Sequence, residues 1–185
     1  MEARARTMMD VVIPKQSLVR DISLVLGFSL ITAICARIAF YVGPVPITGQ
    51  TFAVLIAGAL LGSRKGAMSQ LAYLGIGACG LPFWFAPMTP LGIAALLGPT
   101  GGYLIGFVPA AFVVGLLAER GWDRRIWTTA LAMLAGSAVI YLFGLAWLTR
   151  FVPANVVLTA GLYPFIPGDI AKLLLAAVAL PSGWA

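Results

Sequence analysis

The chain has 185 residues, of which 61% are hydrophobic and only 10% are charged, and its mean hydropathy is +1.01. Soluble domains carry about 25% charged residues, so this composition excludes a soluble globular protein and indicates an integral membrane protein. The net charge of +6 does not imply a nucleic-acid partner here, because the basic residues lie between apolar stretches, where they act as topology signals and lipid contacts.

Apolar stretches joined by short connections follow one another along the chain. A membrane helix needs about 20 apolar residues to cross a hydrocarbon core about 30 Å thick. The second and third stretches are shorter, so we expect those helices to be tilted, broken or shielded by protein. The stretches lie near residues 22–42, 51–63, 66–82, 94–118, 126–149 and 161–180. This pattern predicts an all-α bundle of six transmembrane helices at residues 22–180, between a cytoplasmic tail (1–21) and a short C-terminal tail (181–185).

The first stretch follows a basic segment, which is the layout of a signal peptide. Arg37 interrupts this stretch near its end, and Ile34 precedes Cys35 where a lipoprotein signal requires a small residue. We therefore expect an uncleaved first span.

The distribution of Lys and Arg predicts the orientation. The connections after the first, third and fifth stretches contain one basic residue, Arg150. Most of the other basic residues precede the first stretch or follow the second and fourth: Arg4, Arg6, Lys15, Arg20, Arg64, Lys65, Arg120, Arg124 and Arg125. Because basic loops stay in the cytoplasm, both termini are predicted to be cytoplasmic, in the plasma (inner) membrane.

Small residues recur at four-residue spacing, which in lipid lets helix backbones approach one another closely. In the first stretch, a weaker face of this kind is predicted to be available to another subunit; it consists of Ser29, Thr32, Ala33 and Ala36. The stronger rows are Gly98, Gly102, Gly106 and Ala110, then Gly58, Gly62 and Gly66, and then Ala132 and Gly136.

Asp169 and Lys172 are the last charged residues, and they lie three apart inside the final apolar stretch. An ionisable group at the centre of a bilayer costs about 3 kcal/mol on insertion scales, so it usually faces a cavity, a partner charge or a ligand. The predicted topology places this pair, Arg37 and the 81–100 connection at the outer ends of their helices. We expect them to form one outward-facing pocket whose positive balance suits a small anion.

The residues argue against an enzyme and against a metal site. Asp169 is the only acid embedded in a predicted span, and the chain has no histidine, so neither a paired-acid site nor the usual serine chemistry has its groups. No cofactor is expected, and Cys35 and Cys79 lack metal-ligand spacing. A phosphate-binding GxxxxGK[ST] loop is also missing, so any ATP hydrolysis must come from another polypeptide.

Four passages together resemble the BioY family over about residues 22–180. They are GPVPITGQTF (43–52), AGALLGSRKG (57–66), LGPTGGYLIGF (97–107) and PGDIAK (167–172). The resemblance implies a biotin-binding S component of an energy-coupling-factor transporter, with six helices and an extracellular-side pocket. It also implies a complex in the bilayer with a T component and two cytoplasmic ATPases.

The resemblance also implies the site residues. Asp169 and Lys172 match the acid and base of the family's last helix; a carboxylate can accept ureido N–H bonds, and a cation can bind an anionic end. Gln50 and the turn that contains Thr100 and Tyr103 match positions near the pocket. Gln50 can serve the ureido carbonyl, and Tyr103 can pack on the thiophane ring.

Two features depart from the family pattern. Residues 83–90 (FWFAPMTP) replace a Gly-rich polar stretch, so aromatic residues such as Phe85 either wall the pocket or, as favoured for Trp84, anchor the outer membrane interface. Arg37 stands where the family often has an uncharged polar residue, and it either meets the biotin carboxylate or snorkels to the interface.

Two other functions stay open at this point. One is an S component for another vitamin, for which a broad aromatic cage would favour a flat heterocycle. The other is a non-catalytic scaffold subunit, which predicts no saturable ligand.

Overall fold

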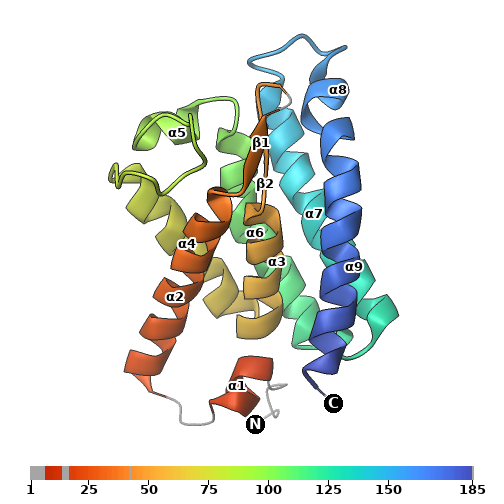
Figure 1. Ribbon diagram of the computed structural model, residues 1–185. Coiled ribbons are helices and arrows are strands. Elements are labelled where there is room, and N and C mark those ends of the chain that lie inside the picture. Colours follow the sequence, from red (N-terminus) through yellow and green to blue (C-terminus); the bar gives the residue numbers. More distant parts are fainter. Residues whose placement is uncertain (1–6, 14–16, 42, 185) are drawn as a thin grey trace.

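The computed structural model describes residues 7–13, 17–41 and 43–184, and this part of the chain is mostly helical (Figure 1). The longer helices are α2 (Leu18–Ala36), α3 (Gln50–Leu61), α4 (Ser63–Ala78), α6 (Gly101–Ala118), α7 (Ile126–Leu148) and α9 (Ile166–Ser182). The short ones are α1 (Met8–Val12), α5 (Ile93–Leu97), α8 (Val157–Gly161) and the 3-10 turns η1 (Trp122–Arg124) and η2 (Tyr163–Phe165).

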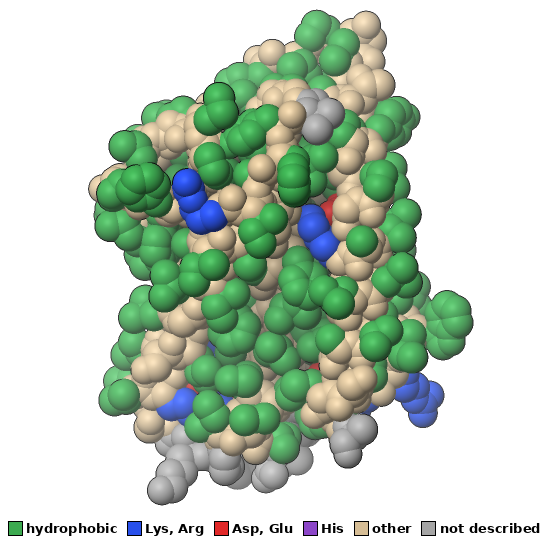
Figure 2. All heavy atoms as spheres, viewed as in Figure 1, with side chains coloured by type: hydrophobic (Ala, Val, Ile, Leu, Met, Phe, Trp, Pro, Cys, Tyr) green, Lys and Arg blue, Asp and Glu red, His purple; other side chains and the backbone are tan. Residues whose placement is uncertain are grey.

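Four stretches of the described chain are long and apolar enough to cross a membrane: Leu18–Ala36, Gly101–Ala118, Ile126–Leu148 and Val157–Ser182. The last of these includes α8, η2 and α9. Helix α3 is apolar but shorter. Length and composition therefore indicate a multi-pass membrane protein without confirming the count of six spans. Hydrophobic side chains cover most of the face in Figure 2, as contact with lipid requires.

The prediction of an all-α fold missed a small hairpin. Strands β1 (Ala39–Tyr41) and β2 (Pro46–Thr48) pair antiparallel, with Ala39 opposite Thr48. The β-branched and aromatic residues of these segments favour strands. However, each strand has only three residues and lies in a longer apolar run, so no alternation of apolar and polar residues can be detected. The hairpin ends at Gly49, whose N–H bonds to the Ile38 carbonyl at 3.0 Å. A Cβ at Gly49 would lie 2.9 Å from the Cys35 carbonyl oxygen, so glycine allows the strand to pass this close to α2.

The observed helices differ from the predicted stretches by one break and two displaced ends. The stretch at 94–118 divides into α5 and α6 at Gly98 and Pro99, because proline lacks the N–H that would continue α5. Helix α2 begins at Leu18 rather than at residue 22, since the Ser17 hydroxyl accepts a hydrogen bond from the Arg20 N–H and caps the helix. Helix α9 runs to Ser182, past the predicted end at 180.

Helix α6 forms the centre of the bundle. In its membrane-length segment 61% of the residues are buried, whereas the corresponding share in α2 is 17%. It packs against α3, α4 and α7. Helix α1 and the end of α9 lie at one end of the bundle, hereafter the terminal end. The hairpin, α5 and α8 lie at the other, hereafter the hairpin end (Figure 1).

Glycines set the spacing of the central helices, as the four-residue pattern predicted. A Cβ on Gly58 would lie 2.5 Å from the carbonyl oxygen of Ala111 in α6, and one on Gly66 would lie 2.8 Å from Gly58. Gly106 packs in the same way against Ile140 of α7. The first member of its predicted row, Gly98, lies instead in the turn before α6.

The prediction for the small face of α2 was wrong. Its residues are not available to another subunit, because they are buried inside this chain against α4. Thr32 is fully buried, and the Gln70 side-chain amide donates to its hydroxyl at 3.3 Å. The period-four pattern locates a contact face but does not say which helix occupies it. The buried residues are Ser29, Thr32, Ala33 and Ala36.

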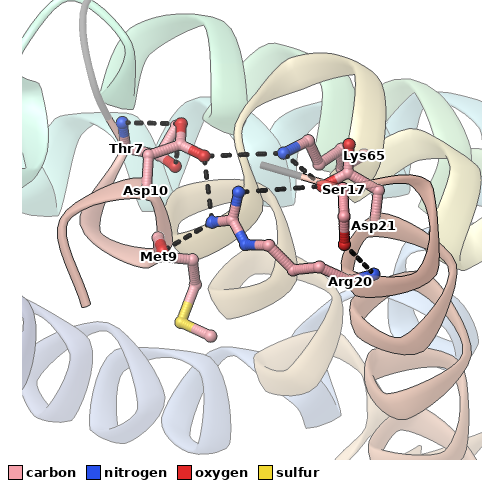
Figure 3. Close-up of polar contacts among 7 residues, drawn as sticks. All are labelled: Thr7, Met9, Asp10, Ser17, Arg20, Asp21 and Lys65. Atoms are coloured by element: carbon pink, nitrogen blue, oxygen red, sulfur yellow. Dashed lines mark hydrogen bonds and ion pairs between the residues drawn. The ribbon is translucent and has the colours of Figure 1, made fainter. Parts of the chain in front are cut away.

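An ionic cluster fastens α1 to the terminal end of the bundle (Figure 3). The Arg20 guanidinium, only 6% exposed, donates to the Met9 carbonyl at 2.6 Å and to Asp10 Oδ1 at 3.1 Å. Lys65 Nζ lies 2.8 Å from Asp21 and 3.5 Å from Asp10. Helices α1, α2 and α4 are therefore joined by paired charges on the side where most basic residues lie.

Replacing Gly58 by alanine tests the close helix contact. Because the new methyl group meets the α6 backbone, we expect Gly58→Ala to lower stability by about 1–3 kcal/mol. Gly75→Ala is the matched control within α4, since nothing lies within 4 Å of its Cβ position. Thermal unfolding in detergent should show a lower midpoint for Gly58→Ala only; equal midpoints would contradict the contact.

The Asp10 cluster predicts a pH-dependent stability. Burial raises the pKa of the Asp10 carboxyl, but hydrogen bonds from Thr7 and Arg20 and the charge of Lys65 outweigh burial and hold that pKa below its ordinary value. A lowered carboxyl pKa stabilises the fold above the unfolded-state pKa, and this is lost as the pH falls through the folded pKa. Asp10→Asn should therefore cost about 1 kcal/mol near pH 7.

The deficit of the same variant should be smaller near pH 3 than near pH 7, because the stabilisation by the Asp10 carboxylate is lost as the pH falls through its lowered pKa. Unfolding midpoints of both proteins at the two pH values measure this. A deficit of equal size at both would mean that the carboxylate charge contributes nothing.

Candidate functional site

A cavity at the hairpin end is the strongest candidate for a binding site. Its empty volume is about 540 Å³, which includes space open to the solvent. Polar groups come from the hairpin and from α3, α6, α7 and α9, and apolar ones from the loop after α4. The lining residues are Val45, Pro46, Thr48, Gln50, Thr51, Phe85, Ala86, Thr89, Thr100, Tyr103, Leu104, Phe107, Ile140, Tyr141, Phe165 and Lys172.

Five of the seven predicted site residues line this cavity: Gln50, Phe85, Thr100, Tyr103 and Lys172. Asp169 does not line the cavity; it pairs with Lys172 and faces a smaller hollow towards α3 and α7 and a larger one between α7 and α9. Arg37 does not line the cavity. It caps the end of α2, and its guanidinium lies 5.4 Å from the centre of the Phe83 ring.

Lys172 is a fully paired cation. Its ammonium donates to the Thr48 carbonyl at 2.9 Å, to the Thr51 hydroxyl at 2.8 Å and to Asp169 Oδ1 at 3.2 Å. Three acceptors satisfy the three N–H groups of lysine. The hairpin and the first turn of α3 therefore hold the charge at a fixed position on the cavity wall.

Asp169 is held on both of its oxygens. Oδ1 takes the bond from Lys172, and Oδ2 accepts a hydrogen bond from the Tyr141 hydroxyl of α7. A carboxylate has about four lone-pair positions, so it can accept further N–H bonds. Arg37 is directed elsewhere, so the prediction that it adds a second positive charge to the pocket is wrong. Lys172 carries the charge on the cavity wall, and Asp169 pairs with it from outside the lining.

Gln50 presents an oriented amide. Its side-chain oxygen accepts from the Thr48 hydroxyl at 2.9 Å, and its nitrogen donates to the Tyr73 hydroxyl. The side chain is buried, and it lies in the first turn of α3, immediately after the hairpin. The amide keeps one N–H and one lone pair that a ligand can use.

Aromatic rings form the apolar wall of the cavity. Tyr103 stacks on Phe165 at 6.3 Å between ring centres, and Tyr141 meets both edge-on. The Tyr103 hydroxyl donates to the Gly161 carbonyl at 2.8 Å, so its polar partner lies within the chain and its ring is left for apolar contact. Gly144 makes room for this ring.

The loop after α4 contributes a second aromatic group. Phe85, only 6% exposed, meets Tyr73 edge-on, and Gly77 provides the space. The Trp84 indole N–H donates to the Tyr73 carbonyl at 2.7 Å, so this partly buried ring packs against Tyr73. Its place at the outer membrane interface stays a prediction, and nothing in the sequence indicated Tyr73 as its partner.

Several residues of the site were not predicted from the sequence. Tyr141 had a usable signal, because it is the only tyrosine in the apolar stretch 126–149. Thr48 and Thr51 had none beyond their place beside Gln50, since their contact with Lys172 joins positions more than 100 residues apart. Tyr73 joins the site through its hydroxyl, which accepts from Gln50, and Phe165 joins it through packing on Tyr103.

The BioY family model matches residues 5–185 of this chain. A probable biotin transporter BioY from Pyrococcus horikoshii is 44% identical over 159 residues, covering 86% of this chain and 93% of the relative. The biotin transporter BioY of Thermotoga maritima is 38% identical over 152 residues, covering 82% and 88%.

The fold is similar to that of a crystallised S component for biotin from an ECF-type ABC transporter. The TM-score is 0.76 at 27% identity, and the match covers 91% of this chain and 94% of the other. The two chains therefore share a fold over nearly the full length of both.

Tyr141→Phe tests the support of Asp169. Removing the hydroxyl leaves Oδ2 with one partner fewer in a protected site, so we expect a loss of about 1–3 kcal/mol in unfolding free energy. Tyr163→Phe is the control, since that side chain is 53% exposed. Thermal unfolding in detergent should separate the two, and equal midpoints would show that Asp169 does not depend on Tyr141.

Proposed function

The chain belongs to the BioY family, and from this premise we propose that it is the biotin-binding S component of an energy-coupling-factor transporter. One observation carries the assignment of the site: a cavity of about 540 Å³ with aromatic walls on one side and the fixed Lys172–Asp169 pair on the other. The role is capture and transport of a ligand, not catalysis.

The cavity matches the chemistry of biotin. The ligand has a ureido ring with two N–H donors and a carbonyl, an apolar thiophane ring, and a valerate carboxylate. Lys172 can bind a ligand oxygen by exchanging one of its three protein acceptors, and Asp169 can accept a ureido N–H next to it. Gln50 and Thr100 supply further polar contacts, while Tyr103 and Phe85 pack on the thiophane ring.

We further propose six spans, formed by α2, α3, α4, α6, α7 and α9, with α3 and α4 shielded by the others. Lys65 and Arg124 lie with α1 and the end of α9, because Lys65 pairs with Asp10 and Arg124 stacks on Trp184. Arg150 follows α7 at the hairpin end. The positive-inside rule then places both termini in the cytoplasm and opens the cavity to the outside of the plasma membrane.

Transport requires partners in this proposal. Because the sequence contains no phosphate-binding loop, a T component and two cytoplasmic ATPases supply the energy. Residues 1–21 form the cytoplasmic segment, 22–180 the substrate-binding domain and 181–185 the C-terminal tail. Biotin seals the cavity under the loop at 81–93, and Arg37 steadies that loop through its contact with Phe83.

Equilibrium binding of biotin to the purified chain in detergent tests the function. We expect saturable binding of biotin and none of riboflavin. Asp169→Asn and Lys172→Met should each weaken binding about 10- to 100-fold, the loss expected for one charged hydrogen bond.

Ser182→Ala is a suitable control, because its exposed hydroxyl bonds only to the Val178 carbonyl at the terminal end. It should bind biotin like the unchanged chain. Folded protein that binds no biotin would overturn the proposed function, whereas biotin binding unaffected by both site variants would overturn only the assigned residues.

A further inference from the structure

We propose that the chain has a second binding site, for one anionic phospholipid, in a groove on the membrane-facing side of α6 and α7. Its empty volume is about 790 Å³. This α6/α7 groove is separate from the biotin cavity, and the proposal does not depend on the transported ligand. Its walls include Ile105 of α6 and Leu142, Phe143, Ala146 and Trp147 of α7, and it ends at Arg150.

The groove faces the lipid, not another part of the chain. Ile105, Leu142 and Phe143 are 39%, 68% and 41% exposed, and Ala146 between them is exposed as well. The small side chain of Ala146 leaves a hollow between its larger neighbours. In a multi-pass membrane protein, an apolar hollow on this side is filled by acyl chains.

The length of the groove along α7 matches the thickness of one leaflet of a bilayer. Helix α7 has 23 residues, and at about 1.5 Å per residue it spans about 34 Å, close to the thickness of the hydrocarbon core. From Leu142 to Arg150 the rise is about 12 Å at the same pitch, so the apolar part occupies one leaflet. Arg150, after the end of α7, then lies at the level of the lipid headgroups.

Arg150 is prepared to bind a phosphate there. Its guanidinium lies 4.3 Å from the centre of the Trp147 ring, and the indole N–H donates to the Gly98 carbonyl at 3.0 Å, which fixes that ring. Stacking occupies one face of the guanidinium and leaves its edge donors accessible. Within the described part of the chain, the Arg150 side chain has no carboxylate partner and donates no hydrogen bond to the protein.

These features select one class of ligand. The planar fork of arginine binds phosphate oxygens in pairs, and the apolar groove takes the attached chains. Among the residues that the structure describes, no acidic one lines the groove, so none there pairs with the positive headgroup of a zwitterionic lipid. An anionic phospholipid satisfies both the charge and the groove.

Native mass spectrometry of the full chain in detergent, with phosphatidylglycerol or phosphatidylcholine added at equal ratio, tests the proposal. We expect retention of one phosphatidylglycerol per chain and little phosphatidylcholine. Arg150→Gln should weaken retention at least about tenfold, as expected when a charge-assisted hydrogen-bonded pair is lost.

Two further variants separate the parts of the site. Arg124→Gln is the matched control, because Arg124 also stacks on a tryptophan, Trp184, at 4.5 Å but lies outside this groove; it should retain the lipid. Ala146→Phe fills the groove on an exposed position and should lose the lipid while Arg150 stays in place. Equal retention of both lipids, or unchanged retention in Arg150→Gln or Ala146→Phe, would overturn the proposal.

Discussion

The cost of holding Lys172 and Asp169 inside an apolar bundle constrains the site more than any other interaction. A charge in this environment needs a complete set of partners, and here the partners come from four separate parts of the chain. The hairpin supplies the Thr48 carbonyl, α3 the Thr51 hydroxyl, and α7 the Tyr141 hydroxyl, while α9 carries the pair itself. The position of each of these elements is thus linked to the others through two side chains.

Glycine contacts make that convergence possible. Gly58 lets α3 touch the backbone of α6, and Gly106 does the same for α6 and α7. In lipid, helices associate mainly through close packing of this kind, because their apolar surfaces gain little from leaving an apolar solvent. The two aromatic groups at the cavity also depend on glycines that leave space for their rings, since Gly77 accommodates Phe85 and Gly144 accommodates Tyr103. The glycine pattern is therefore part of the site as well as of the fold.

The sequence predicted best those features that follow from hydropathy and rare residues. The longer helices lie near the predicted stretches, and the ion pair stands out because charges inside spans are rare. What it could not predict depends on contacts between distant residues. The hairpin is too short to show a period, and the small face of α2 gave no sign that α4 covers it. The direction of Arg37 depends on Phe83, which lies in a loop whose conformation no local pattern specifies.

The direction of Arg37 changes how the cavity must recognise its ligand. A pocket with an excess of positive charge would attract any small anion, as the sequence first suggested. With Arg37 against Phe83, the cation on the wall is Lys172, and Asp169 beside it already satisfies its charge. A ligand gains only if its own donors and acceptors replace these bonds in the same positions, because any buried group left unpaired costs free energy. Selection then depends on the pattern of hydrogen bonds and not on net charge. In the proposed function, a ureido ring, whose donors and acceptor lie close together, would therefore suit the pair better than a simple carboxylate would.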